Sequence, residues 1–243
     1  MMTQHPDQPH TLRSYDDDLL GIRALVEAAG DLAQRQVLAA VDAMSRRDLG
    51  EASQIVAADE DLDRLQAQIE HDAISTIGRR APMADDLREI ISAIKIAGEL
   101  ERIGDYAKNI AKRIPVIAET APVDPAVIIP EIAGFVANMV RSAITAYIER
   151  DADAAMNVIR RDATVDEYYN SLFRALLVHM IENPKHTTQS VHLLFVTKNL
   201  ERIGDRATNI AEMVYYSATG QTAGTRAPAV SAAYDAVVPS EGK

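Results

Sequence analysis

Apolar residues recur three and four positions apart along most of the chain, and the alternation typical of β-strands is nearly absent. This spacing predicts amphipathic helices, each with an apolar stripe that faces a core. Glycine and proline interrupt the pattern at a few points and mark the connections between helices. The predicted helices span 16–46, 49–79, 84–114, 126–149, 152–182 and 186–217. We therefore expect an all-α protein.

Three residues near the predicted helix starts have the chemistry of helix N-termini. Asp48 is followed three positions later by Glu51, which is the spacing of a capping box. Asp151 stands in the corresponding place before the fifth predicted helix. Pro125 suits the first turn of the fourth helix, because a backbone N–H at that position has no partner within the helix.

A twelve-residue segment occurs twice, one hundred positions apart. It reads Leu-Glu-Arg-Ile-Gly-Asp-Tyr-Ala-Lys-Asn-Ile-Ala over 100–111, and ten of its twelve positions recur over 200–211. A weaker repeat at an offset of 103 pairs Asp48 with Asp151. Two copies of a three-helix unit explain both offsets, so we expect two pseudo-symmetric three-helix bundles. The predicted bundles span 14–120 and 121–220, between disordered tails at 1–13 and 221–243.

Packing explains the apolar part of the repeated segment. Leu100, Ile103 and Ala107 follow the three-four spacing of a coiled-coil seam, and the second copy keeps it. Gly104 and Gly204 stand in the middle of their helices, where glycine costs about 1 kcal/mol relative to alanine. Because both copies keep the glycine, we expect another backbone to approach closely at that point.

Packing does not explain the polar residues of the repeated segment, which form one stripe beside each apolar seam. They are Glu101, Asp105 and Asn109 in the first copy and Glu201, Asp205 and Asn209 in the second. Two acids four positions apart repel each other by a few tenths of a kcal/mol, roughly, unless positive charge lies between them. The stripes therefore indicate either a bound cation or a solvated acidic edge balanced by Arg102 and Arg202.

A cation bound there would be a metal ion that prefers oxygen ligands. Carboxylates and amides suit magnesium, calcium, manganese or oxidised iron better than copper or zinc, although the sequence does not fix the choice among iron, manganese, magnesium, zinc and calcium. Two carboxylates are too few for tight binding, so a neighbouring helix must contribute. Asp63 and Asp166 are the preferred candidates, ahead of Asp59 and Asp162, because they lie closer to the apolar side of their helices.

Composition and motifs exclude several function classes. A net charge of −11 disfavours a nucleic-acid surface, and the absence of cysteine excludes disulfides and thiolate sites. No signal peptide is evident, and no window approaches the roughly 20 uncharged apolar residues of a membrane span. We therefore expect a cytoplasmic protein. No phosphate loop, Ser-His-Asp set or Glu-x-x-His motif is present, so the sequence carries no catalytic constellation.

The doubled motif resembles that of the PhoU family of phosphate-transport accessory proteins. The segments Ser14-Tyr15-Asp16, 79–88 (beginning Arg-Arg-Ala-Pro) and 215–220 also resemble that family, so the resemblance covers 14–220. It implies two pseudo-symmetric three-helix bundles. It also implies that Glu101 with Asp105, and Glu201 with Asp205, hold iron or another metal.

The resemblance further implies a regulator and not an enzyme. Such a protein keeps the phosphate-starvation response silent when phosphate is plentiful and restrains phosphate uptake. Its implied partners are the ATPase subunit of a phosphate ABC transporter and a membrane sensor histidine kinase, so it meets the membrane only through them. We expect a homodimer. Two alternatives remain open, a carboxylate-bridged metal enzyme and a purely structural helical adaptor without metal.

Overall fold

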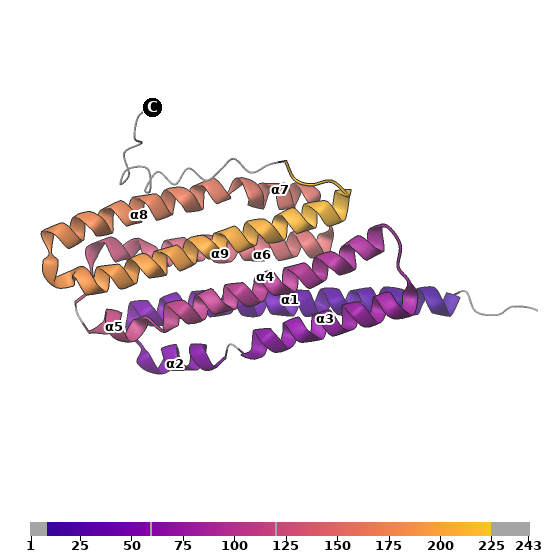
Figure 1. The fold of residues 1–243 in the computed structure, drawn as a ribbon, viewed down its shortest axis with the longest axis horizontal. Coiled ribbons are helices and arrows are strands. Elements are labelled where there is room, and N and C mark those ends of the chain that lie inside the picture. Colours follow the sequence, from indigo (N-terminus) through magenta and orange to yellow (C-terminus); the bar gives the residue numbers. More distant parts are fainter. Residues whose placement is uncertain (1–8, 59, 120, 225–243) are drawn as a thin grey trace, which may run out of the picture.

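The computed structural model describes residues 9–58, 60–119 and 121–224, and every regular element in this part of the chain is a helix (Figure 1). The α-helices are α1 (Pro9–Arg46), α2 (Leu49–Ala57), α3 (Glu60–Arg80), α4 (Asp85–Ala111), α5 (Ile114–Ala118), α6 (Ile129–Glu149), α7 (Ala152–Arg160), α8 (Asp162–Glu182) and α9 (Thr187–Thr219). Short 3-10 turns, η1 (Asp124–Ile128) and η2 (Pro184–His186), precede α6 and α9. The predicted all-α class is confirmed.

The long helices form two pseudo-symmetric bundles that share one core. Helices α1, α3 and α4 pack together, with α2 against α1 and α4, while α6, α8 and α9 pack together, with α7 against α6 and α9. Helix α1 also packs on α6, and α4 packs on α9, so the long helices run side by side (Figure 1). The buried apolar residues of both bundles belong to a single continuous cluster. The two predicted three-helix bundles are therefore present and are joined along four central helices.

Several predicted helix boundaries were wrong. The predicted helix 49–79 is divided into α2 and α3 after Ala57, and 152–182 is divided into α7 and α8 at Arg161. The spacing of apolar residues continues through both breaks, so periodicity did not reveal them. Helix α1 begins at Pro9, so part of the predicted tail 1–13 is helical. Residues 1–8 and 225–243 lie outside the described part of the chain.

The two predicted aspartate caps are confirmed. The Oδ1 atom of Asp48 accepts a hydrogen bond of 2.9 Å from the backbone N–H of Glu51, and the Oδ1 atom of Asp151 accepts one of 2.9 Å from Ala154. Each cap satisfies a backbone donor that would otherwise have no partner in the first helical turn. Helices α2 and α7, which correspond in the two bundles, therefore begin with the same aspartate cap.

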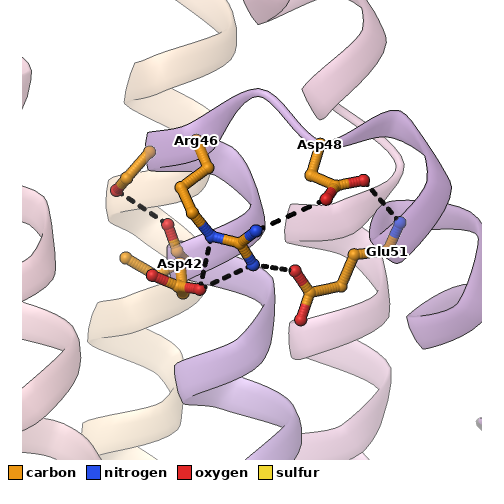
Figure 2. Close-up of polar contacts among 6 residues, drawn as sticks. Asp42, Arg46, Asp48 and Glu51 are labelled. Carbon is orange, nitrogen blue, oxygen red and sulfur yellow. Dashed lines mark hydrogen bonds and ion pairs between the residues drawn. The ribbon is translucent and has the colours of Figure 1, made fainter.

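The capping box at Asp48 is incomplete, because the Glu51 carboxylate pairs with Arg46 instead of the Asp48 backbone (Figure 2). The same guanidinium contacts the carboxylates of Asp42 at 2.8 Å and Asp48 at 3.4 Å. The backbone N–H of Asp48 donates to the carbonyl of Ala43 at 2.9 Å. Arg46 thus ties the end of α1 to the start of α2 through an exposed ion cluster.

Pro125 does not lie in the first turn of the fourth long helix, as predicted. It lies in η1, and Pro130 takes the first-turn position of α6. Both prolines suit the start of a helix, and the chain uses one for the short turn and the other for the long helix.

The segment Asp124–Glu149 is long and apolar enough to cross a membrane by length and composition alone, although Glu131 and Arg141 interrupt its apolar residues. Half of that apolar window is buried inside the bundle, where α6 packs against α1 and α9. We therefore assign α6 as a core helix of the fold.

Gly104 and Gly204 mark close approaches between helices, but a side chain approaches and not the backbone that was predicted. A Cβ atom on Gly104 would overlap the Cδ1 atom of Leu62 from α3. A Cβ atom on Gly204 would lie 2.9 Å from Cγ1 and 3.1 Å from Cγ2 of Val165 in α8. The glycines therefore bring the second and third long helices of each bundle together.

We expect Gly204→Ala to lower the free energy of unfolding by about 1 kcal/mol. Alanine gains about 1 kcal/mol of helix propensity, but overpacking against the stiff, β-branched Val165 costs about 1–3 kcal/mol. Urea unfolding followed by circular dichroism measures the difference. Gly134→Ala is the matched control, because Gly134 in α6 has nothing within 4 Å of its Cβ position and should gain about 0.5–1 kcal/mol. A stabilising Gly204→Ala would contradict the packing argument.

Candidate functional site: acidic edges of the two bundles

The second acidic stripe faces helix α8. Glu201 exposes 13% of its side chain, and its Oε1 atom accepts a hydrogen bond of 2.7 Å from Nζ of Lys198. The other carboxylate oxygen, Oε2, is buried without a hydrogen-bond partner among the described residues. Asp205 on the same helix and Asp166 from α8 are near enough for their charges to act on Glu201. The structure therefore groups three of the predicted ligands.

The electrostatics of this group favour a cation. Burial raises the pKa of Glu201 above its usual value, and the negative charges of Asp205 and Asp166 raise it further, against the opposing hydrogen bond and charge of Lys198. A raised pKa means that the surroundings of the carboxylate do not fully stabilise its negative charge. A metal ion would supply that charge and a partner for Oε2.

The first acidic stripe is more open to solvent. Asp105 exposes 46% of its side chain and lies 3.4 Å from Nζ of Lys108. Glu101 is half-buried on α4, and Asp63 on α3 is exposed. This edge has the same residue types as the second, with less desolvation of its carboxylates. The carboxylates of the second acidic stripe are therefore less exposed to solvent than those of the first.

The two predicted amide ligands lie at the interface between the bundles. Nδ2 of Asn209 donates a 3.5 Å hydrogen bond to Oε2 of Glu99 on α4, and Nη1 of Arg206 donates a 3.0 Å hydrogen bond to the same oxygen. Asn109 lines a cavity of about 300 Å³ between α4 and α9. The structure therefore does not bring Asn109 and Asn209 together with the carboxylates of their stripes.

Asp162, the lower-ranked candidate on α8, has a structural contact. Its Oδ1 atom accepts a 3.0 Å hydrogen bond from Oγ1 of Thr208, and both residues are buried. Its counterpart in the repeat, Asp59, lies outside the described residues.

Within residues 9–58, 60–119 and 121–224, no group of three or more carboxylate or imidazole side chains is arranged to hold a metal ion. The carboxylates of Glu201, Asp205 and Asp166 interact through their charges without converging on one point. The metal ligands therefore stay a prediction, and binding would require their side chains to rotate inward.

Sequence reasoning missed the lysines that balance the two acidic stripes. Lys198 precedes Glu201 by three positions and Lys108 follows Asp105 by three. The signal was present in the sequence, because side chains three apart on a helix are neighbours. The two lysines occupy different places in the two copies, so a search for repeated residues could not find them.

A tandem of three-helix bundles, each with an acidic motif on its last helix, defines the class to which this protein belongs. The family model of the PhoU domain matches the chain twice, over 26–114 and 129–214, which are the two bundles. The chain therefore belongs to the PhoU family, as the resemblance of its motifs predicted.

Relatives and solved structures agree with this assignment. A protein of Zymomonas mobilis is 45% identical over 212 residues, covering 87% of this chain and 90% of the relative. One of Caulobacter vibrioides is 42% identical over 220 residues, covering 90% and 96%. Both are named phosphate-specific transport system accessory protein PhoU homolog.

The crystal structure of PhoU from Pseudomonas aeruginosa matches with a TM-score of 0.81 at 35% identity, over 85% of this chain and all of that one. The phosphate transport system regulatory protein PhoU from Streptococcus pneumoniae matches with a TM-score of 0.80 at 23% identity, over 87% and 100%, and supports the fold alone.

Proposed function

We propose that this protein is an accessory protein of phosphate-specific transport and a cytoplasmic negative regulator of the phosphate-starvation response. The observation that carries the proposal is the family match in both bundles, together with relatives of the same name that are matched over nine-tenths or more of their length. In this role the protein restrains phosphate uptake. It couples the ATPase subunit of the transporter to a sensor histidine kinase and acts as a homodimer.

An adaptor role suits the chemistry of the described residues better than catalysis does. Hydrolysis at a carboxylate-bound metal needs a general acid or base beside the metal. The described pair His179 and His186 lies at the turn between α8 and α9, where Nε2 of one ring is 3.2 Å from Nδ1 of the other. The carboxylates of the acidic edges have lysines as neighbours instead. We therefore favour regulation by binding over an enzymatic reaction.

The acidic edges supply the metal sites of this adaptor in our proposal. Glu201 and Asp205 with Asp166 form one site, and the corresponding acids of the first bundle form the other. The unpartnered Oε2 atom of Glu201 and its raised pKa support this choice. Oxygen ligands suit iron, manganese, magnesium or calcium. A metal bound there would fix the register of the second and third long helices, and thereby the surface offered to the partners.

Deletion of the gene tests the regulatory role. We expect strong derepression of a phosphate-repressed reporter, such as secreted alkaline phosphatase, in phosphate-rich medium, because the negative regulator is lost. The wild-type gene should restore silence. Phosphate-poor medium, in which the reporter is active in both strains, is the control. A reporter that stays silent after deletion would contradict the proposal.

A further inference from the structure

The pseudo-symmetry of the chain relates the turn at Arg47 to the turn at Arg150, but different side chains surround the two turns. Offsets of 103 near the start of each repeat and of 100 near its end relate the family matches 26–114 and 129–214. Arg47 and Arg150 correspond, and both have a left-handed backbone with φ of 58° and 54°. The N–H of each donates to the carbonyl three residues earlier, that of Met44 at 3.2 Å and that of Tyr147 at 3.3 Å. The two turns are therefore built alike, and differences around them come from other side chains.

Around Arg150 the space is filled by an ion cluster. The carboxylate of Glu89 is buried and accepts hydrogen bonds of 2.5 and 2.9 Å from Nε and Nη2 of Arg23. Nη1 of Arg150 lies 3.4 Å from the same carboxylate. Tyr147 is buried and its pKa is raised by burial and by the charge of Glu89. Side chains of α1, of α4 and of the end of α6 thus meet here in one ion cluster.

Around Arg47 the corresponding side chains line a cavity of about 530 Å³. By the offsets of 103 and 100, Ala126 takes the place of Arg23, Met44 that of Tyr147 and Gln189 that of Glu89. Each replacement removes volume, charge or both. A cavity of this size lies within the range of small-molecule sites, roughly 300–1,000 Å³.

The cavity has an apolar wall and one arginine, Arg47, that has no ion-pair partner among the described residues. Its wall includes Ile117, Val123 and Leu193. Nε2 of the buried Gln189 donates to the carbonyl of Ile117 at 3.1 Å. Arg47 forms no ion pair with any described residue, whereas its counterpart Arg150 faces the Glu89 carboxylate. The other charged side chain of the lining, Asp124, is exposed. The cavity therefore has room for an apolar group and an arginine that could receive an anion.

We propose that this cavity binds a small, mainly apolar molecule with a single carboxylate, of the medium-chain fatty acid type. The carboxylate pairs with the guanidinium of Arg47, to which the neutral Gln189 offers no countercharge of the kind that Glu89 offers Arg150. The hydrocarbon chain occupies the volume that Arg23 and Tyr147 fill in the other half of the molecule. The segment that connects the two bundles, including Val123, forms one wall of the cavity. A bound ligand would therefore contact this connection. This site is independent of the acidic edges and of the proposed regulatory role.

Calorimetric titration of the full-length protein with decanoate, below its micellar concentration, tests the proposal. We expect saturable binding of about one decanoate per chain, and weaker binding of decanol, which lacks the charge. Arg47→Gln should weaken decanoate binding about tenfold or more, because a charge-assisted contact is lost, and should leave decanol binding unchanged. Arg46→Gln is the matched control, since Arg46 belongs to the neighbouring exposed cluster and does not line the cavity.

The double variant Ala126→Arg, Gln189→Glu rebuilds the ion cluster of the other half inside the cavity and should abolish binding of both probes. Circular dichroism shows whether it folds. If it does not fold, Val127→Trp serves instead, because Val127 lines the cavity at an exposed position and a larger side chain there narrows the entrance. The absence of saturable decanoate binding, an unchanged affinity in Arg47→Gln, or full binding by a folded cavity-filling variant would overturn the proposal.

Discussion

Glu89→Ala is expected to lower the free energy of unfolding by about 3 kcal/mol. Removing the carboxylate leaves the guanidiniums of Arg23 and Arg150 without their shared partner, and removing one side of a buried pair typically costs about 3–5 kcal/mol. The arginine side chains are 23% and 38% exposed, so water compensates part of the loss and the lower end of that range applies. Urea unfolding followed by far-ultraviolet circular dichroism measures the effect.

The repeat supplies the control for this prediction. Gln189 is the counterpart of Glu89 and is equally buried, but its side chain is neutral and donates a hydrogen bond of 3.1 Å to the carbonyl of Ile117. Gln189→Ala should therefore cost only about 1 kcal/mol. If both variants lose the same stability, the ion cluster does not hold α1, α4 and α6 together in the way that its geometry indicates.

The architecture was predictable because each copy of the repeat contains a complete apolar seam. Leu100 and Leu200 are fully buried, as are the isoleucines three positions after them. The breaks after Ala57 and at Arg161 were not predictable, because apolar residues keep helical spacing through them and only packing on the neighbouring helices shows where the chain turns. Local capping chemistry, in contrast, identified both Asp48 and Asp151 correctly.

The candidate site was predictable in its carboxylates but not in its amides. Helical periodicity places Glu201 and Asp205 on one stripe, and Asp166, predicted from the repeat, lies on α8 near enough for its charge to act on Glu201. Over eight residues, however, the helix has rotated by about 80°, so Asn209 points toward a different neighbour, Glu99 on α4. The identity of that neighbour depends on how the two bundles pack. No spacing within a single helix contains this information.

Alanine at Glu101, Asp105, Glu201 and Asp205 together is expected to abolish bound metal in the purified protein, as measured by elemental analysis. These carboxylates are the hard ligands that the proposed sites require, and no thiolate is available to replace them. The folded bundle should persist, because the buried seam does not depend on the acids. Manganese at about 100 times its dissociation constant should stabilise the wild type by about 2.7 kcal/mol for each occupied site and the variant not at all.

The matched control removes the same charge from exposed acids elsewhere. Its positions are Glu119, Asp153, Glu167 and Glu182, all exposed and outside both stripes. This variant should keep the metal content and the manganese-dependent stabilisation of the wild type. Equal metal content in the stripe variant and in this control would contradict the assignment of the sites.

The single variant Glu201→Gln separates two effects of the Glu201 carboxylate: the loss of stability that its buried charge causes, and the metal binding that the charge makes possible. Because the folded pKa of Glu201 is raised, the folded protein holds this proton more tightly than the unfolded chain, so stability falls as the pH rises from the unfolded pKa through the folded one. Without metal at neutral pH, Glu201→Gln should therefore be as stable as the wild type or more stable, by up to about 1 kcal/mol. With manganese the order should reverse, because glutamine lacks the charge that binds the ion. A wild type that is more stable than Glu201→Gln in the absence of metal would show that Lys198 alone already satisfies the carboxylate, and the acidic edge would then have no need of a cation.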